Sequence, residues 1–551
     1  MKTMKYIYYI VCAALACSLV SCSLDEKAEH FISDPSSFYQ NSNQCRSVVN
    51  DLYPPLKGIY TFRMLTVTDA HSDILYEPAP TVTEARLDLS PALPGFSATL
   101  WDNYYQMVMR ANSAIAGISR YCPLAPEVKG AFVAEAKVMR AYAYYFLTSF
   151  FHDVPFYTCD VIDVQTMNKI ASLGRMSAVA TRDSLINDLN AELAAGHLEL
   201  KRTSEVAGNR AGGALALMLV AKMAMWNAAQ DPDNSDAWYD KALTALKELE
   251  KIYGDLTETN YPLKETMFKF HNNAESIFEI QHTYDSGGTV YVGSLSSVCL
   301  PYRKAVIDPV TGEDIGATFS GLTVNYIGND ATYWTAARPN VYFSGSLQIN
   351  DAKDNPDGYD KRAYYNMSWG YSPIYDNEDV LTCDTPCNPL LAGYASFNSS
   401  DINTRPFMGP KFWCPHMYTS NDSNNYTVFR YADAVLMMAE IYCHKGDQTN
   451  FLKYINKTRT RAGLAPYTFR NWTKALTELQ DERARELFGE FHRRFDLVRW
   501  GMWYERTKEL NDYQELRENI KPCHEYLPIP DTQVIYSGHA LDNNEYNKYG
   551  L

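Results

Sequence analysis

Apolar residues recur at intervals of three and four positions in two long parts of this chain, and this helical spacing fades in the stretch between them. The segment 98–121 shows it clearly, because Trp101, Tyr105, Val108 and Ile115 fall on one side of a helix. A helix of this kind has to bury its apolar face against neighbouring elements. The pattern therefore predicts a mostly α-helical protein with a helix-poor middle.

The helical parts divide into neighbouring helices with short connections. Periodicity begins over 41–56, and helices are expected at 98–121, 126–151, 181–195, 212–227 and 238–252, then at 429–445, 450–462, 472–491 and 493–506. Alanine-rich helix pairs of this kind resemble tetratricopeptide packing, although no clean repeat period is visible. The apolar stretch 213–229 comes nearest to a membrane span, but Lys222 interrupts it, and its pattern suits a buried helix.

The stretch 261–427 is rich in Gly, Pro, Asn, Asp and Tyr and has few apolar periods. Its segment 276–282 alternates well enough to predict a short strand. Loops as long as the remainder are usually functional or disordered. The chain holds 41 Tyr, and the density of aromatic side chains here argues against disorder. We therefore expect ordered loops with a few short strands.

The N-terminus resembles a bacterial lipoprotein signal. A short basic start precedes an apolar run that is too short to span a membrane comfortably, and residues 19–22 (LVSC) resemble a lipobox. This pattern predicts a signal peptide over 1–21, lipidation of Cys22 and a lipidated tether over 22–40. The alternative is an ordinary secretory signal with a chance cysteine. Asp25 and Glu26 resemble a surface-export signal of Bacteroidetes lipoproteins.

Charge and cysteine content exclude several classes of site. The net charge of −15 argues against nucleic acid as a partner. Cys383, Cys387, Cys414 and His416 are too loosely spaced for a metal site, so a local disulfide or free thiols are expected. The segment 351–360 looks like a calcium loop but lacks the key EF-hand ligands, which leaves only a looser calcium site open. No cofactor is expected.

The sequence contains none of the common catalytic motifs, including the zinc-protease, nucleotide-binding and serine-hydrolase patterns. A charged cluster near the C-terminus has two interpretations, a carboxylate active site or a structural ion-pair network; its members are Arg483, Glu486, Arg493, Asp496 and Arg499. Acids interleaved with arginines are held ionised rather than tuned as proton donors. The network is therefore favoured, and no enzyme activity is expected.

Several blocks occur in the order typical of one family. They are RAYAYYF at 140–146 with Asp153-Val154-Pro155, RYADAVLMMAE at 430–440, YINKTRTRAGL at 454–464, ERAREL at 482–487, RRFDLVRWG at 493–501 and LPIP at 527–530. Together they resemble the SusD/RagB family of Bacteroidetes surface lipoproteins. One departure is His152, which stands where the family usually has Gly.

The resemblance implies a fold, a location and a partner. It implies tetratricopeptide-like helix pairs packed against a loop-rich region, with an N-terminal helical region over 41–260, a ligand-facing region over 261–427 and a C-terminal helical region over 428–551. It also implies an outer-membrane lipoprotein that faces the cell exterior and delivers glycans to a SusC-like TonB-dependent transporter. RagB-like peptide binding is the alternative ligand class.

Glycan binders present aromatic rings beside planar polar groups, because sugars have apolar C–H faces and hydroxyl edges. The candidate ligand-binding residues are Asp73, Tyr76, Tyr284, Asp285, Tyr291, Trp334, Arg338, Tyr365, Asn366, Trp369 and Tyr371. For any one of them, core packing or contact with the barrel is the alternative. Trp101 is expected in a helix core. A glycoside hydrolase and a lid without ligand affinity remain the competing classes of function.

Overall fold

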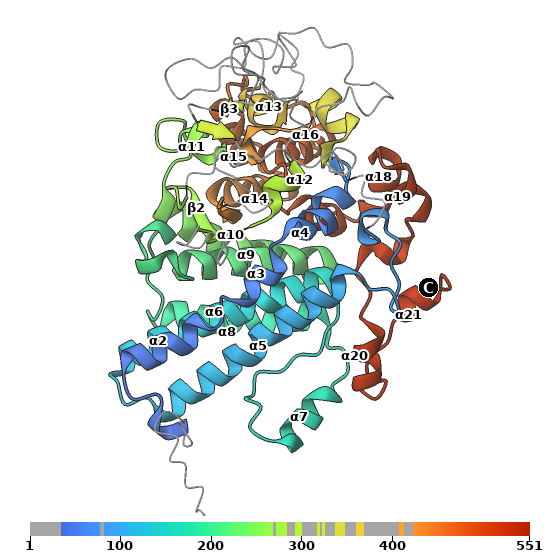
Figure 1. Cartoon of the computed structure of the whole chain (residues 1–551). Coiled ribbons are helices and arrows are strands. Elements are labelled where there is room, and N and C mark those ends of the chain that lie inside the picture. The colour runs from blue at the N-terminus through green and yellow to red at the C-terminus, as the bar shows by residue number, and fades with distance from the viewer. Residues whose placement is uncertain are drawn as a thin grey trace, which may run out of the picture.

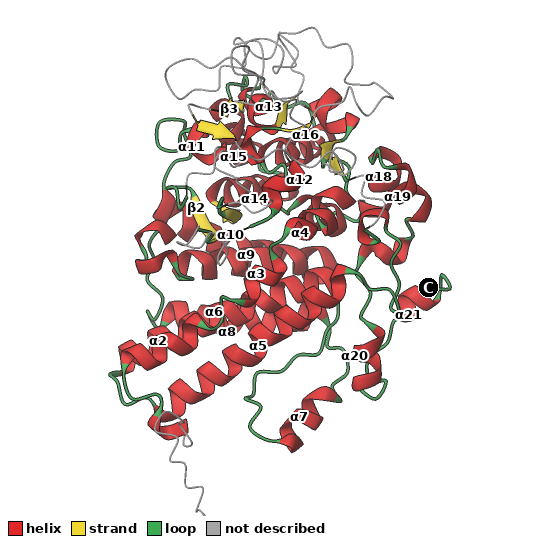
Figure 2. Cartoon of the chain, in the orientation of Figure 1, coloured by secondary structure: helices red, strands yellow, loops and turns green. Residues whose placement is uncertain are grey.

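A computed structural model of the chain describes residues 35–77, 82–267, 271–283, 293–299, 317–319, 322–324, 337–347, 360–368, 407–412 and 423–551. Helices dominate these residues, and the few strands are short (Figures 1 and 2). The mostly α-helical fold predicted from the sequence is confirmed.

The N-terminal part of the fold is an array of packed helices. It contains α2 (Ser42–Asn50), α3 (Pro55–Ile59), α4 (Phe62–Val67), α5 (Phe96–Tyr121), α6 (Pro126–Phe151), α7 (Val164–Ala171), α8 (Ala178–Ala194), α9 (Gly213–Gln230) and α10 (Ser235–Tyr253). The helix α5 packs on α6, α6 on α8, α8 on α9, and α9 on α10. Such helix-on-helix contacts are those expected of tetratricopeptide-like pairs.

The remaining helices lie mostly in the C-terminal part of the chain. They are α11 (Leu263–Met267), α12 (Leu295–Cys299), α13 (Lys361–Asn366), α14 (Tyr431–His444), α15 (Gln448–Arg461), α16 (Trp472–Glu486), α17 (Arg493–Arg499), α18 (Trp503–Leu510), α19 (Gln514–Asn519), α20 (Asp531–Tyr536) and α21 (Asn544–Asn547). Because α14 packs on α10, α15 and α16, the two helical parts share one core.

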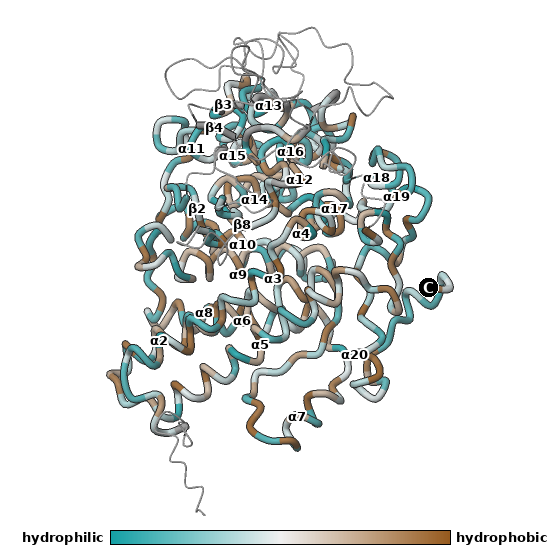
Figure 3. The backbone as a smooth tube through the Cα atoms, viewed as in Figure 1, coloured by the Kyte–Doolittle hydropathy of each residue, from teal (hydrophilic) through white to brown (hydrophobic). Residues whose placement is uncertain are grey.

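The apolar faces predicted from the periodicity form that core. Trp101 is 4% exposed, as expected for a helix-core residue, and packs against Phe151 of α6. Figure 3 shows hydrophobic and hydrophilic residues alternating along these helices. The segment Ala207–Gln230 is long and apolar enough to cross a membrane, but 94% of its apolar window is buried in the protein. Lys222 in this helix pairs with Asp433 of α14 at 2.5 Å, which confirms the predicted buried helix.

Each described strand pairs with one antiparallel partner. The pairs are β1 (Leu75–Tyr76) with β5 (Arg338–Pro339), β2 (Ser276–Ile280) with β8 (Tyr426–Arg430), β3 (Ala317–Phe319) with β4 (Leu322–Val324), and β6 (Met367–Ser368) with β7 (Phe407–Met408). The strand predicted at 276–282 is therefore present as β2. Since Phe429 and Arg430 belong to β8, the following helix begins at Tyr431 rather than at Phe429.

The helix predicted at 472–491 ends earlier, at Glu486. The backbone then turns through Gly489 (φ 70°) and Phe491 (φ 68°), both in the left-handed region. A Cβ atom at Gly489 would lie 2.4 Å from the ring of Phe412, so a glycine is required there. The carboxylate of Asp69 accepts the backbone N–H groups of Phe491 (3.1 Å) and Arg493 (2.9 Å), and it thereby fixes the turn.

Candidate ligand-binding site

Two described parts of the helix-poor region, α13 and the segment Tyr342–Leu347, are attached to the C-terminal helices. The helix α13 and its neighbouring strands lie beside α16, at the end of the molecule opposite α7 (Figure 1). The segment Tyr342–Leu347 packs on α16, and the Tyr342 hydroxyl donates to Asp481 at 2.6 Å.

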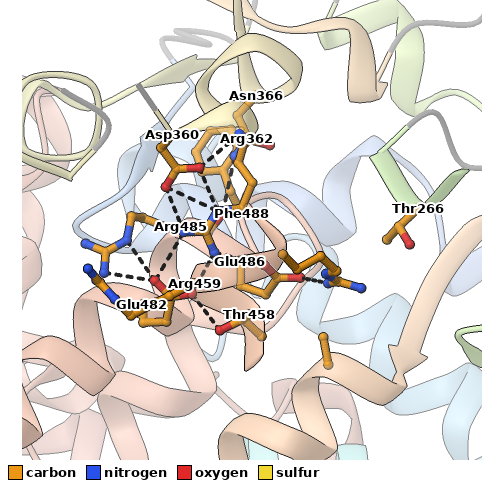
Figure 4. Close-up of polar contacts among 12 residues, drawn as sticks. Thr266, Asp360, Arg362, Asn366, Thr458, Arg459, Glu482, Arg485, Glu486 and Phe488 are labelled. Atoms are coloured by element: carbon orange, nitrogen blue, oxygen red, sulfur yellow. Dashed lines mark hydrogen bonds and ion pairs between the residues drawn. The ribbon is translucent and has the colours of Figure 1, made fainter. Parts of the chain in front are cut away.

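Arg362 of α13 fastens this region to α16 (Figure 4). Its guanidinium donates to Asp360 (2.7 Å), to Glu482 (2.8 Å) and to Glu486 (2.9 Å), and all four side chains have no solvent exposure. Thr458 of α15 also donates to Glu482, at 2.6 Å. Five donors on one planar group satisfy several carboxylates at once, which a lysine could not do with the same geometry.

A second arginine continues the same network toward the strands. Arg430, the last residue of β8, pairs with Glu275 (2.8 Å), Glu486 (2.6 Å) and Glu490 (2.7 Å). Arg461 binds Glu275 at 2.7 Å and also contacts Glu486. The network thus ties β2, β8, α15 and α16 into one unit.

These contacts keep the acids ionised. Burial would raise their pKa, but the adjacent arginines outweigh it and lower the pKa of Glu482 to about 2 and of Glu486 further still. Arg483 is likewise paired with Asp496 at 2.7 Å and Asp433 at 2.9 Å. The predicted ion-pair network is therefore confirmed, and its carboxylates lack the raised pKa of a general acid.

Three of the candidate ligand-binding residues lie within this scaffold. Asp73 is fully buried, with Arg493 at 2.7 Å and Arg506 at 2.8 Å from its carboxylate. Tyr76 and Arg338 are opposite each other in the β1–β5 pair and are 2% and 1% exposed. Their burial leaves no surface for a ligand in this structure, so we assign them a supporting role and exclude them from the proposed contact set.

The other candidates divide between α13 and undescribed segments. Tyr365 is half-buried, whereas Asn366 is fully buried and donates to the backbone oxygen of Arg485 at 3.3 Å. Asn366 therefore also supports the scaffold. The candidates Tyr284, Asp285, Tyr291, Trp334, Trp369 and Tyr371 lie outside the described residues, as do Cys22, the calcium-loop-like segment up to 359 and the Cys383–His416 group.

A cavity that the sequence did not reveal opens between α3, the turn at 207–210 and strand β2. Its volume is about 450 Å³. The lining combines aromatic rings with planar polar groups. The rings are those of Tyr53, Phe278 and His282, and the polar groups are those of Asn50, Asn209, Arg210 and Gln281. Rings suit the C–H faces of a sugar, and amides and guanidinium groups suit its hydroxyls. We call it the β2 cavity, and His282 in its wall stands two residues before the candidate Tyr284.

Two family models match the chain. The model described as "SusD family" matches residues 325–546, and the one described as "Starch-binding associating with outer membrane" matches residues 87–205. SusD-like protein P25 of Formosa agariphila is 26% identical over 99% of this chain and 99% of its own length. The chain belongs to the SusD/RagB family. The second description associates such proteins with the outer membrane.

Solved structures of SusD-like proteins share the fold. Surface glycan-binding protein A of Bacteroides uniformis has a TM-score of 0.67 at 19% identity, with 92% of this chain and 100% of that chain covered. The Bacteroides thetaiotaomicron protein of the same name, in complex with laminarihexaose, has a TM-score of 0.64 at 20% identity, with the same coverage. At these identities the likeness establishes the helical SusD-like fold.

The SusD/RagB blocks recognised in the sequence occupy scaffold positions. Arg140 of the first block binds Asp188 at 2.6 Å and Asn112 at 2.8 Å, between α5, α6 and α8. Arg430 and Glu486, from two later blocks, are the centre of the network described above. The blocks therefore report the fold of a SusD/RagB protein and do not identify its ligand.

Glu77 follows Tyr76 in the sequence and is buried, and it should make the stability of the protein depend on pH. Burial raises the pKa of Glu77 to about 7, and Thr66 donates to its carboxylate. Because the folded-state pKa exceeds the ordinary value of about 4.3, the stabilisation is complete below about pH 4.3 and is lost as pH rises through about 7. The Glu77→Gln variant should therefore be more stable than the parent at pH 8, on the order of 3–4 kcal/mol, but not at pH 4.

Urea unfolding of both proteins at several pH values measures this difference. Glu199→Gln provides the control, because the Glu199 side chain is 72% exposed. A gain in stability that stays constant between pH 4 and pH 8 would show that Glu77 does not titrate in this range.

Proposed function

We propose that this protein captures oligosaccharides or polysaccharides at the cell surface and passes them to a SusC-like TonB-dependent transporter, without cleaving them. The observation that carries the proposal is membership of the SusD/RagB family, together with a family model described as starch-binding. A related structure was solved with laminarihexaose, and another related structure is that of a laminarin-binding SusD-like protein. Starch and β-glucans are therefore the first ligands to test.

The β2 cavity and the aromatic candidate residues of the helix-poor region form the proposed contact surface. We place Tyr365, Trp334 and Trp369 in this surface, with Tyr371, Tyr284, Asp285 and Tyr291 as further members. The cavity contributes rings and amides. Its lining residue His282 stands two residues before Tyr284 in the sequence, which connects the cavity to the Tyr284, Asp285 and Tyr291 candidates. The buried network supports a non-catalytic role, because its acids are all held by arginines.

Native affinity electrophoresis tests the proposal. The chain from Ser23 to Leu551 is run in gels that contain starch, laminarin, other plant, fungal and host polysaccharides, or casein-derived peptides. Retardation by a polysaccharide supports glycan binding and names its class. Binding of peptides alone would instead favour RagB-like peptide capture, and no interaction with any ligand would favour a lid that has no affinity of its own.

We further propose that Cys22 carries the lipid anchor of an outer-membrane lipoprotein that faces the cell exterior. The Cys22→Ala variant is expected to incorporate no labelled palmitate and to leave the membrane fraction, because the acyl chains supply the membrane affinity. Metabolic labelling and fractionation measure both, with Cys159→Ala as the control because Cys159 is exposed and lies far along the chain. Unchanged labelling of Cys22→Ala would contradict the assignment.

A further inference from the structure

Two cysteines that are far apart in the sequence lie side by side in the helical core. Cys45 belongs to α2, and Cys122 directly follows the last residue of α5. Their Sγ atoms are 3.6 Å apart, and the two residues are 0% and 7% exposed. Both are free thiols in this structure. Neither lines the β2 cavity, so the proposed glycan surface does not account for the pair.

The packing around the two thiols holds them in register. The helix α2 runs beside α5 (Figure 1), and the ring of Tyr39, just before α2, stacks on that of Tyr121 with ring centroids 6.1 Å apart. Tyr39 also lies against Gly117, where a Cβ atom would collide with its ring, so a glycine is required for this close approach. The segment 39–45 therefore follows the end of α5 closely, and the two sulfur atoms face each other as a result.

The two thiols are close to the geometry of a disulfide. An S–S bond is about 2.05 Å long, so the sulfur atoms have to approach each other by about 1.5 Å. Cys122 is placed to make this movement, because its backbone is extended (φ −74°, ψ 121°) and lies outside α5. A rotation of its side chain about the Cα–Cβ bond moves Sγ without unwinding a helical turn.

Burial decides when such a bond can form. Burial, together with the hydrogen bond to Cys122, raises the pKa of the Cys45 thiol to about 11, and the thiolate is the form that reacts. An oxidant cannot reach side chains that are buried this deeply. The bond therefore has to form while the chain folds, before α2 packs on α5, and the finished core then shields it from reductants.

We propose that Cys45 and Cys122 form a disulfide in the exported protein, which fastens the first helix after the lipid anchor to the end of α5. The inference rests on one part of the proposed function, export from the cytoplasm, because disulfides form and persist outside that compartment. In the reaction both S–H bonds break and one S–S bond forms. The two electrons and two protons pass to the disulfide of a thiol oxidase, which leaves as a dithiol.

The disulfide would connect the tether to the helical array. Cys45 stands 23 residues after Cys22, so a pull on the lipid anchor would reach α5 through covalent bonds rather than through the packing of α2 alone. The bond also closes the segment 45–122 into a loop, which restricts the unfolded chain and thereby stabilises the fold.

Thiol labelling tests the proposal. The chain from Ser23 is produced twice, in a bacterial periplasm behind an unrelated signal sequence and in the cytoplasm, and is unfolded in urea with N-ethylmaleimide and digested without reductant. Mass spectrometry of the periplasmic protein should find a peptide pair that is linked through Cys45 and Cys122 and separates on reduction. Cys159 and Cys443, an exposed and a buried thiol, should carry the label in both preparations.

The outcome is independent of the other proposals, because the unrelated signal sequence imposes the compartment and glycan affinity is measured separately. Maleimide on both Cys45 and Cys122 in most molecules of the periplasmic protein would overturn the disulfide. The same linked pair in the cytoplasmic protein before cell lysis in the label would overturn its dependence on export.

Thermal unfolding of the periplasmic protein provides a second measurement. A reductant should lower the unfolding midpoint of the parent by about 3–5 °C, since the unfolded chain loses its cross-link. The double variant Cys45→Ala, Cys122→Ala should not respond to the reductant, whereas Cys443→Ala should respond as the parent does. Equal responses of the parent and the double variant would contradict the proposal, and if the double variant does not fold, the labelling of the parent still decides.

Discussion

Replacing Arg430 with methionine is expected to lower the free energy of unfolding by about 3–5 kcal/mol, because it removes one of the counter-ions that the buried carboxylates share and leaves the network with an excess negative charge. Arg430 is 1% exposed and contacts Glu275, Glu486 and Glu490 within 2.8 Å. Methionine restores volume but no positive charge. Chemical unfolding followed by circular dichroism at pH 7 measures the loss.

Two controls separate this effect from a simple loss of packing. Lys251→Met removes a cation from an exposed pair with Glu248 and should cost less than about 1 kcal/mol. The double variant Arg430→Met, Glu275→Gln should recover part of the lost stability, since one excess negative charge is removed with the arginine while Arg461 keeps Glu486 as its partner. Equal losses in Arg430→Met and Lys251→Met would mean that the buried network contributes no more than a surface ion pair.

Alanine at Trp334 and at Trp369 is expected to weaken binding to the retarding polysaccharide about tenfold each, which corresponds to about 1.4 kcal/mol. A tryptophan that stacks on a sugar ring contributes area and ring contact that alanine cannot replace. Both residues lie outside the described part of the chain, so this prediction rests on the aromatic clustering in the sequence. The dissociation constant from calorimetry with an oligosaccharide of that glycan measures each loss.

Tyr536→Ala is the matched control, because Tyr536 is a 75% exposed aromatic residue on α20, far from α13 in Figure 1. It should bind the glycan as the parent protein does. If both tryptophan variants retained full affinity, the ligand would contact other residues, and the β2 cavity, with Tyr53 and Arg210 in its wall, would become the next surface to test.

The helices were predictable where a local signal marks their ends. Pro126 at the first position and the Asp153-Val154-Pro155 stop gave α6 its correct bounds, since proline suits a helix start and cannot continue a helix. The end of α16 was not predictable in this way. It depends on Phe412, which excludes a side chain at Gly489, and on Asp69, which lies far away in the sequence.

The candidate site was harder to predict, because burial of a polar residue depends on partners that only the fold brings together. The sequence around Asp73 suggests an exposed acid in a loop, whereas the structure pairs its carboxylate with Arg493 and Arg506. Arg362 likewise gives no local sign that three carboxylates surround it. The β2 cavity joins α3 to β2 across more than 200 residues of sequence, and no motif marks it.

The most direct test of the central claim combines binding and turnover on one sample. The chain from Ser23 is titrated calorimetrically with oligosaccharides of the polysaccharide that retards it, and the same mixture is assayed for new reducing ends after prolonged incubation. A non-catalytic glycan-binding SusD/RagB protein predicts saturable binding and no increase in reducing ends. New reducing ends, or no saturable binding to any glycan of the panel, would contradict this account.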